Sequence, residues 1–197
     1  MTHDLILALV AFAFVTSVTP GPNNLMLMAS GATFGFRRTV PHMLGVGLGF
    51  TAMTALIGVG IAGLLTASPA LALALKVVSF AYMLWFAWKI LHAPAPGTSE
   101  PASRPMTFLQ AAAFQWVNPK AWAMALTAVS AYAPDRSMGA VMLVSVIFGL
   151  INIPSVGSWT LLGQAMRGFL AGAARRRAFK ATMAALLVLS LLPVLTH

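Results

Sequence analysis

Residues 17–26 read SVTPGPNNLM and interrupt an apolar stretch that starts at Leu5. Pro20 and Pro22 lack a backbone N–H, and each ring clashes with a carbonyl of the preceding helical turn. Gly21, which lies between them, permits a change in backbone direction. A helix that enters this segment is therefore expected to end there, and a second helix is expected to begin just after it.

Two asparagines, Asn23 and Asn24, stand at the start of that second helix. The first turn of a helix has free N–H groups and a partial positive charge, which favour a carboxylate or another anion. A proline kink that only shapes helix packing is the alternative interpretation. Two prolines followed directly by two polar side chains favour a binding site instead.

The overall composition is typical of a membrane protein. Of the 197 residues, 59% are hydrophobic and 8% are charged, and the mean hydropathy is +0.88. Soluble domains have roughly 25% charged residues, so this chain lacks the polar side chains that a soluble surface needs. Cysteine is absent, which excludes disulfides, zinc-thiolate sites, iron–sulfur clusters and thiol nucleophiles. His42 and His92 are expected at span ends and His3 and His197 near the termini, a spacing that indicates no metal and no cofactor.

Six stretches are long and apolar enough to cross a membrane as helices of about 20 residues. They are apolar on all sides and lack the alternation of β-barrel strands. The predicted fold is therefore an all-α polytopic membrane protein with six transmembrane helices. The expected spans are residues 5–31, 41–65, 71–91, 108–132, 138–162 and 179–195.

The basic residues are distributed unevenly between the loops. Nine of the 12 Lys and Arg residues fall in the odd-numbered loops, whereas the even-numbered loops hold Arg136 alone. Basic loops stay in the cytoplasm, so both termini are expected outside. The formal net charge of +9 is thus mainly a topology signal, and nucleic-acid binding is not needed to explain it. The nine residues are Arg37, Arg38, Lys89, Arg104, Arg167, Arg175, Arg176, Arg177 and Lys180.

A proline-rich segment, residues 93–105, divides the chain into two halves. It reads APAPGTSEPASRP and is expected to form an extended cytoplasmic linker. Residues 1–92 and residues 106–197 would each hold three spans, so the second half enters the membrane from the opposite side. The halves are then two inverted three-helix repeats of one integral membrane domain, 1–197, an architecture that many transporters use. A match between VTP at 18–20 and VNP at 117–119 supports this relation.

The fourth expected span contains its own interruption, FQWVNPKAW at residues 114–122, with Pro119 at its centre. Lys120 lies 12 residues from either end of that span, roughly 18 Å, too far to reach a membrane surface easily. A lysine near the midplane costs about 2.5–3.5 kcal/mol unless it is compensated. Three solutions remain open: amides and carbonyls such as those of Asn118 and Gln115, loss of the proton, or an anionic group on a bound molecule. A shifted span boundary that brings Lys120 nearer the surface is a further alternative.

Two other features concern the interior of the bundle. Asn152 lies next to Pro154 in the fifth expected span and is expected to line the same cavity as the two breaks. Gly45 and Gly49 form a GxxxG pair, which predicts close packing of the second span against a neighbouring helix.

These motifs together resemble the LysE/RhtB family of amino-acid exporters. The resemblance rests on TPGPNN at 19–24, ATFGFRRTVPHMLGVGLGF at 32–50, AYMLWFAWK at 81–89 and QWVNPKAW at 115–122, and it extends over nearly the whole chain. It is greatest for the subgroup that exports cysteine and O-acetylserine. It implies a multi-pass protein of the bacterial inner membrane that exports amino acids with the proton gradient. Asn23 stands where many members have aspartate, which leaves the proton-coupling group open.

The resulting hypothesis is an exporter of small zwitterionic amino acids or their derivatives, with alternating access around a site near the midplane between the two breaks. Its expected partners are the substrate, protons and the lipid bilayer, and a homo-oligomer is compatible with the sequence. A passive channel or facilitator is one alternative. A membrane-embedded enzyme is another, disfavoured because no cysteine, histidine or carboxylate is expected at depth and no residue is assigned a catalytic role. The predicted substrate-binding residues are Pro20, Gly21, Pro22, Asn23, Asn24, Gln115, Asn118, Pro119, Lys120 and Asn152.

Overall fold

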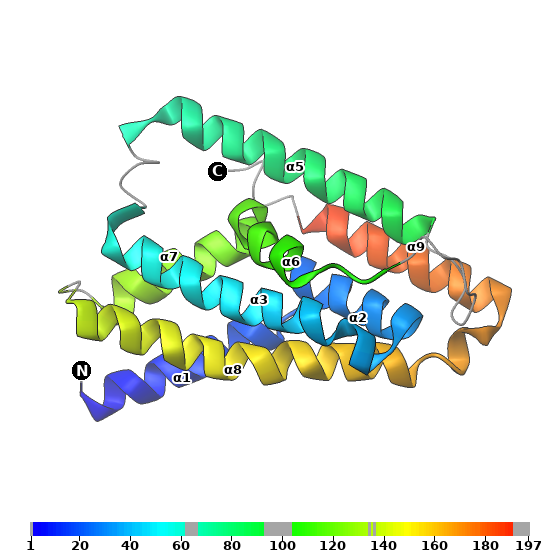
Figure 1. The fold of residues 1–197 in the computed structure, drawn as a ribbon, viewed down its shortest axis with the longest axis horizontal. Coiled ribbons are helices and arrows are strands. Elements are labelled where there is room, and N and C mark those ends of the chain that lie inside the picture. The colour runs from blue at the N-terminus through cyan, green and yellow to red at the C-terminus, as the bar shows by residue number, and fades with distance from the viewer. Residues whose placement is uncertain (1, 62–66, 93–103, 134, 136, 191–197) are drawn as a thin grey trace.

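The computed structural model describes residues 2–61, 67–92, 104–133, 135 and 137–190, and its regular elements there are helices (Figure 1). The all-α prediction is therefore confirmed. Three short turns of other helix types accompany the α-helices: η1 (Ile57–Ile61, π-helical), η2 (Gln115–Val117, 3₁₀) and η3 (Phe169–Ala171, 3₁₀). The α-helices are α1 (His3–Val18), α2 (Pro22–Phe34), α3 (Phe36–Leu56), α5 (Pro69–Leu91), α6 (Phe108–Phe114), α7 (Pro119–Tyr132), α8 (Met138–Ala165) and α9 (Ala173–Leu189).

The sequence predicts six membrane-crossing helices, but in the described residues fewer single helices are long and apolar enough to cross a membrane. In the described part of the chain, three segments are long and apolar enough: Phe36–Gly60, Leu73–Leu91 and Met138–Ala165. The bent pair α1 and α2 makes a fourth if it counts as one crossing. The expected fourth span is divided into α6 and α7, each shorter than a bilayer is thick. Six spans and the inverted repeat therefore stay predictions.

The expected sixth span, 179–195, is displaced in the structure. Helix α9 begins at Ala173, so Arg175, Arg176, Arg177 and Lys180 lie within its first half instead of in the loop before it. Only residues up to 190 belong to the described part of that span. The charged first half of α9 is the physical reason that this helix differs from an ordinary apolar span.

The second expected span also begins earlier than predicted. Gly35 has a φ of 83°, a left-handed conformation that glycine adopts readily, and the chain turns there from α2 into α3. Pro41, interpreted as the start of the span, lies inside α3. His42 is consequently not at a span end, because the first two turns of α3 precede it and its side chain is buried.

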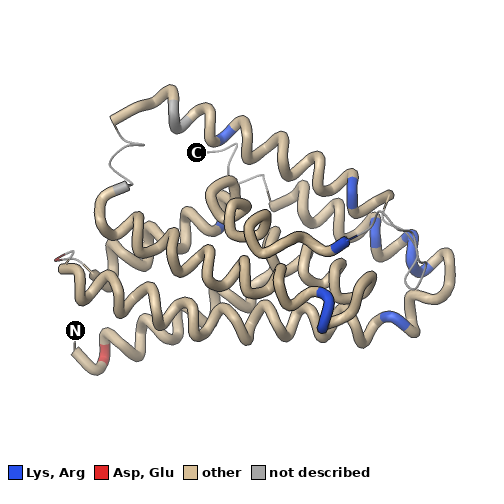
Figure 2. Tube along the Cα trace, viewed as in Figure 1, with Lys and Arg blue, Asp and Glu red and all other residues tan. Residues whose placement is uncertain are grey.

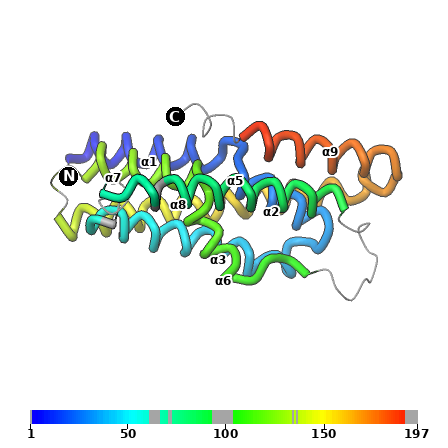
Figure 3. Tube along the Cα trace, turned by 90° about the horizontal axis from the view of Figure 1, so that it is seen from above, coloured from blue at the N-terminus to red at the C-terminus, as the bar shows by residue number. Residues whose placement is uncertain are grey.

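Helix α8 is the central element of the packing. It runs along the length of the molecule, with α1 beside its first half and α2 beside its second half (Figures 1 and 3). A Cβ on Gly31 of α2 would collide with the backbone of Thr160, and one on Gly163 would collide with the backbone of Met28. The two helices therefore touch backbone to backbone.

The GxxxG prediction for α3 is confirmed. A Cβ on Gly49 would lie 2.6 Å from the Cα of Ala112, and a Cβ on Gly45 would collide with the carbonyl oxygen of Phe108. Both contacts are with α6, so the glycines bring α3 against the helix that precedes the second break. This packing is what places that break in the interior.

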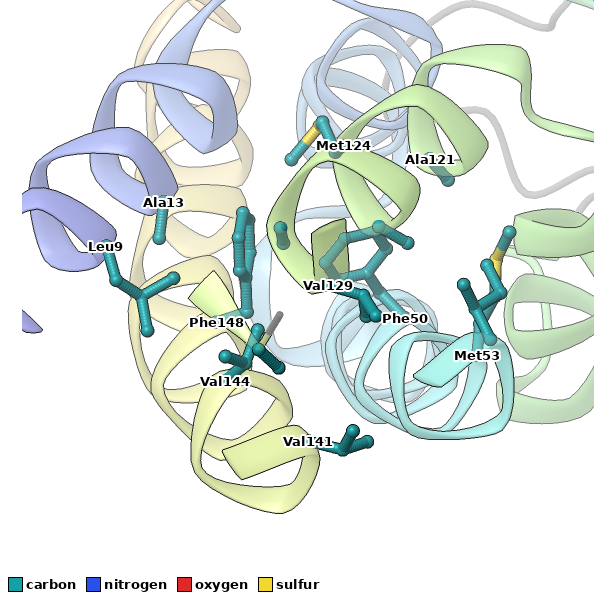
Figure 4. Close-up of a cluster of buried hydrophobic side chains, with 14 residues drawn as sticks. Leu9, Ala13, Phe50, Met53, Ala121, Met124, Val129, Val141, Val144 and Phe148 are labelled. Carbon is teal, nitrogen blue, oxygen red and sulfur yellow. The ribbon is translucent and has the colours of Figure 1, made fainter. Parts of the chain in front are cut away.

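The two ends of the molecule differ in chemistry. A cluster of buried apolar side chains from α1, α3, α7 and α8 fills the half that contains the start of α1 (Figure 4). Phe50 and Phe148 meet at its centre with ring centroids 5.2 Å apart. Most of the described Lys and Arg residues lie toward the other end (Figure 2). Asp4 lies in the first turn of α1.

The close contact between α2 and α8 gives a test of the fold. Gly163→Ala should lower the free energy of unfolding by about 1–3 kcal/mol, because the new methyl group overpacks against the backbone of Met28. Gly139→Ala in the same helix, where nothing lies within 4 Å of a new Cβ, should be neutral or stabilising by up to about 1 kcal/mol. Thermal unfolding of the purified protein in detergent measures both, and equal midpoints for the two variants would contradict the packing.

Candidate functional site at two helix breaks

The first break lies where the prolines predict it. Helix α1 ends at Val18, α2 begins at Pro22, and the two helices are bent by 53°. The carbonyl groups left without helical donors accept hydrogen bonds from side chains. The Asn24 Nδ2 donates to the carbonyl oxygens of Ser17 (2.7 Å) and Thr19 (2.9 Å). Polar backbone groups in the interior of a membrane protein need such partners.

The second break is built by local rules around Asn118. This residue is extended, with φ −94° and ψ 107°, because the ring of Pro119 disfavours a helical conformation in the residue before it. Its Oδ1 accepts a hydrogen bond from the backbone N–H of Lys120 at 3.1 Å, so Asn118 is the N-cap of α7. Pro119 occupies the first helical position, where a missing N–H costs nothing.

Lys120 joins the two breaks. Its Nζ donates to the carbonyl oxygen of Thr19 at 2.7 Å, to the Thr19 Oγ1 at 2.9 Å and to the carbonyl oxygen of Pro20 at 3.4 Å. The ammonium thus lies at the C-terminal end of α1, where the helix dipole favours a cation. Carbonyl compensation was one of the three predicted solutions. The acceptors, however, come from Thr19 and Pro20, whereas the Asn118 Oδ1 contacts the Lys120 backbone instead.

Gly21 has a different role from the predicted one. Its φ of −172° is an ordinary extended value, so its conformational freedom is not used. A Cβ at this position would lie 2.6 Å from the Lys120 Cδ and 3.0 Å from its Nζ. Glycine is therefore required as space for the lysine that crosses the break.

A reciprocal amide pair forms a second connection between the breaks. The Asn23 Nδ2 donates to the Gln115 Oε1 at 2.8 Å, and the Gln115 Nε2 donates back to the Asn23 Oδ1 at 3.2 Å. Gln115 also donates to the carbonyl oxygen of Ala111 at 2.9 Å and is fully buried. The pair links the first turn of α2 to the end of α6, 92 positions away in the sequence.

Asn152 brings α8 into the same site. Its Nδ2 donates to the Ser17 Oγ at 3.3 Å, and its buried Oδ1 has no partner within the described ranges. A small cavity of about 20 Å³ lies here, room for about one water. Among the predicted site residues, Gly21, Asn23, Asn24, Asn118, Lys120 and Asn152 line it. Pro20, Pro22, Pro119 and Gln115 shape or flank the breaks.

The sequence reasoning missed three residues of this site. Ser17 and Thr19 provide acceptors for Asn24, Asn152 and Lys120 through the bonds given above. Trp159 of α8 donates from its Nε1 to the carbonyl oxygen of Val18 at 3.1 Å. The position of Ser17 and Thr19 just before the prolines could have indicated their role as hydrogen-bond acceptors. No feature of the sequence around Trp159 indicates its role.

The contact across Gly21 can be tested by a double-mutant cycle. Gly21→Ala should lower the free energy of unfolding by about 1–3 kcal/mol, because the methyl group displaces the Lys120 side chain. The loss should be smaller when Lys120→Ala is also present, since the clash is then removed. Thermal unfolding in detergent gives the four values, and additive effects would rule out the contact.

Comparison with known proteins identifies the family of the chain. A family model described as LysE type translocator matches residues 14–192. A cysteine/O-acetylserine efflux protein of Klebsiella pneumoniae is 31% identical over 165 residues, and those of Salmonella typhimurium and Escherichia coli K12 are 32% identical over 166. Each alignment covers 83% of this chain and 84% of the relative. No solved structure matches the chain. The chain therefore belongs to the LysE family of translocators and is a transporter rather than an enzyme.

Proposed function

We propose that this protein exports small zwitterionic amino acids or their derivatives across the bacterial inner membrane. The observation that carries the proposal is the pair of joined breaks, which concentrates backbone carbonyls, N–H groups, amides and one ammonium in an apolar bundle. Family membership supports transport, and the names of the relatives support amino acids such as cysteine and O-acetylserine as the cargo.

The site has complementary groups for both charges of a zwitterion. A substrate carboxylate would bind the Lys120 ammonium and the free N–H groups at the start of α2. The substrate ammonium would bind the carbonyl oxygens freed at the breaks and the amide oxygens of Asn23 and Asn118. Lys120 would then exchange its bonds to Thr19 and Pro20 for the carboxylate.

Binding at the breaks requires a change of conformation. The cavity there, at about 20 Å³, is too small for an amino acid. A rocking movement between parts of the bundle would enlarge it and open it to alternate sides, as in other transporters with broken helices. The proton gradient would drive the cycle, and Lys120 is the ionisable group at the breaks. Of the carboxylates that the structure describes, Asp4 lies in the first turn of α1 and Asp135 follows the end of α7, whereas Lys120 lies in the first turn of α7.

Replacement of Lys120 tests its role. In proteoliposomes loaded with labelled O-acetylserine, the efflux rate should be at least ten-fold lower for Lys120→Met than for the wild type, because the substrate carboxylate loses its cationic partner. Lys76→Met in α5 is the matched control, since Lys76 lies outside the cavity at the breaks, and it should leave efflux near the wild-type rate. Efflux by Lys120→Met equal to that of the control would overturn the assignment.

A second experiment addresses the driving force. Collapse of an imposed pH gradient with an ionophore should reduce wild-type efflux to the rate seen without a gradient. An efflux rate that does not respond to the gradient would contradict proton coupling and favour a passive facilitator.

The orientation is testable because the chain has no native cysteine. Gly139 and Gly168 lie at opposite ends of the α8 region and have free space for a side chain. A membrane-impermeant maleimide should label Gly139→Cys in intact cells and Gly168→Cys only after permeabilisation. The reverse pattern would show that the basic end faces outward.

A further inference from the structure

A cavity large enough for an amino acid lies away from the breaks, at the basic end of the molecule. Its volume is about 340 Å³, and it is enclosed by α2, α5, α9, the first turns of α3 and the segment after Arg104. The space at the breaks is about 20 Å³. In this conformation the space at the breaks is too small for an amino acid.

His42 forms part of the wall of this cavity and has unsatisfied polar atoms. Its side chain is 1% exposed, and neither ring nitrogen has a hydrogen-bond partner among the residues that the structure describes. A buried polar group without a partner is costly, and a neutral imidazole carries one donor and one acceptor. A bound molecule in the cavity would provide the missing partner.

Ser30 adds a second acceptor to the same wall. Its Oγ lies 3.0 Å from the Thr39 Oγ1, and the Thr39 hydroxyl donates to the carbonyl oxygen of Gly35 at 2.8 Å. A hydroxyl has one proton, so Ser30 must be the donor in its contact with Thr39. The lone pairs of the Ser30 Oγ then remain available to a ligand in the cavity.

The cationic side chains of the cavity are more exposed than this wall. Lys89 and Arg104 are exposed and Arg176 and Lys180 are half-buried, whereas Ser30 and His42 are buried. The described lining contains no Asp or Glu. The cavity therefore has buried acceptors on one side and cations on its accessible side, an arrangement complementary to a molecule with one ammonium and one carboxylate.

We propose that this cavity is a second substrate site, which receives a zwitterionic amino acid on the cytoplasmic side before it reaches the breaks. The inference rests on the proposed export function. The substrate ammonium binds His42 and Ser30, and its carboxylate faces Arg176. The two sites are connected by one face of α2, on which Asn23, Met26 and Ser30 recur at helical spacing. Seven residues of helix place the wall about 10 Å from the Asn23–Gln115 pair.

Replacement of His42 by an apolar residue of similar shape separates a binding role from a structural one. His42→Phe should weaken O-acetylserine binding to the purified protein at least ten-fold in calorimetry and raise the KM on the cytoplasmic side in inside-out vesicles. The unliganded protein should unfold at the same or a higher temperature, since an unsatisfied polar group is removed. His92→Phe is the control, because His92 lines the same cavity but is exposed and bonded to the Trp88 carbonyl oxygen. Wild-type affinity in His42→Phe would overturn the proposal.

A charge variant tests the other side of the cavity. Arg176→Gln should raise the KM for O-acetylserine but not for its methyl ester, which lacks the carboxylate. Arg175→Gln removes the same charge from the same helix outside the cavity and should change neither value. Equal effects on acid and ester would contradict a carboxylate contact.

Two further measurements separate this proposal from its alternatives. An anionic lipid headgroup has the same charge as the carboxylate, so phosphatidylglycerol is titrated in parallel. Lipid stabilisation that is lost in Arg176→Gln, with amino-acid binding unchanged, would overturn the substrate site in favour of a lipid site. Wild-type efflux is measured first, and its absence for all amino acids would contradict the export function. If wild-type efflux is present and the His42 and Arg176 variants bind and transport O-acetylserine like the wild type, the second site alone is contradicted.

Discussion

The hydrogen bond between the Lys120 ammonium and the Thr19 carbonyl oxygen, 2.7 Å long, is the contact on which the two breaks depend. The prolines of the first break leave carbonyl groups without helical donors, and a membrane interior provides none. The second break introduces a cation without a carboxylate partner. Each break compensates the other, and Gly21 provides the space in which they meet.

The nature of this contact also matters for transport. A lysine paired with an aspartate in an apolar bundle is hard to separate, because each charge loses its only partner. Lys120 is held by neutral carbonyl and hydroxyl oxygens instead. A substrate carboxylate competes well with neutral acceptors for an ammonium, since charge-assisted hydrogen bonds are the stronger ones. The scarcity of acidic residues is thus consistent with the proposed exchange of this contact for a substrate carboxylate.

The sequence predicted those parts of the site that follow from local chemistry. Proline acts on its own turn, so the break before Pro22 and the extended conformation of Asn118 could be derived from residue order. The partners of the breaks could not, because the Trp159 bond to Val18 depends on how α8 packs. His42 was misplaced because Pro41 was interpreted as a helix start, whereas the turn lies at Gly35. The basic residues of α9 were placed in a loop because charge patterns report topology more directly than helix boundaries.

The packing divides the bundle into tight and looser parts. Helix α2 touches α8 through its backbone at Gly31 and Gly163, and Arg167 after α8 donates to the Ala32 and Thr33 carbonyl oxygens at the end of α2. These contacts leave no room for side chains between the two helices, so they hold α2 and α8 tightly together. Helices α5 and α9 pack on each other and, together with α2, enclose the cavity that contains His42. A movement of the α5–α9 pair relative to the α2–α8 pair would change access to this cavity without breaking the backbone contacts between α2 and α8, but it would disturb the apolar cluster that α2, α5 and α9 share.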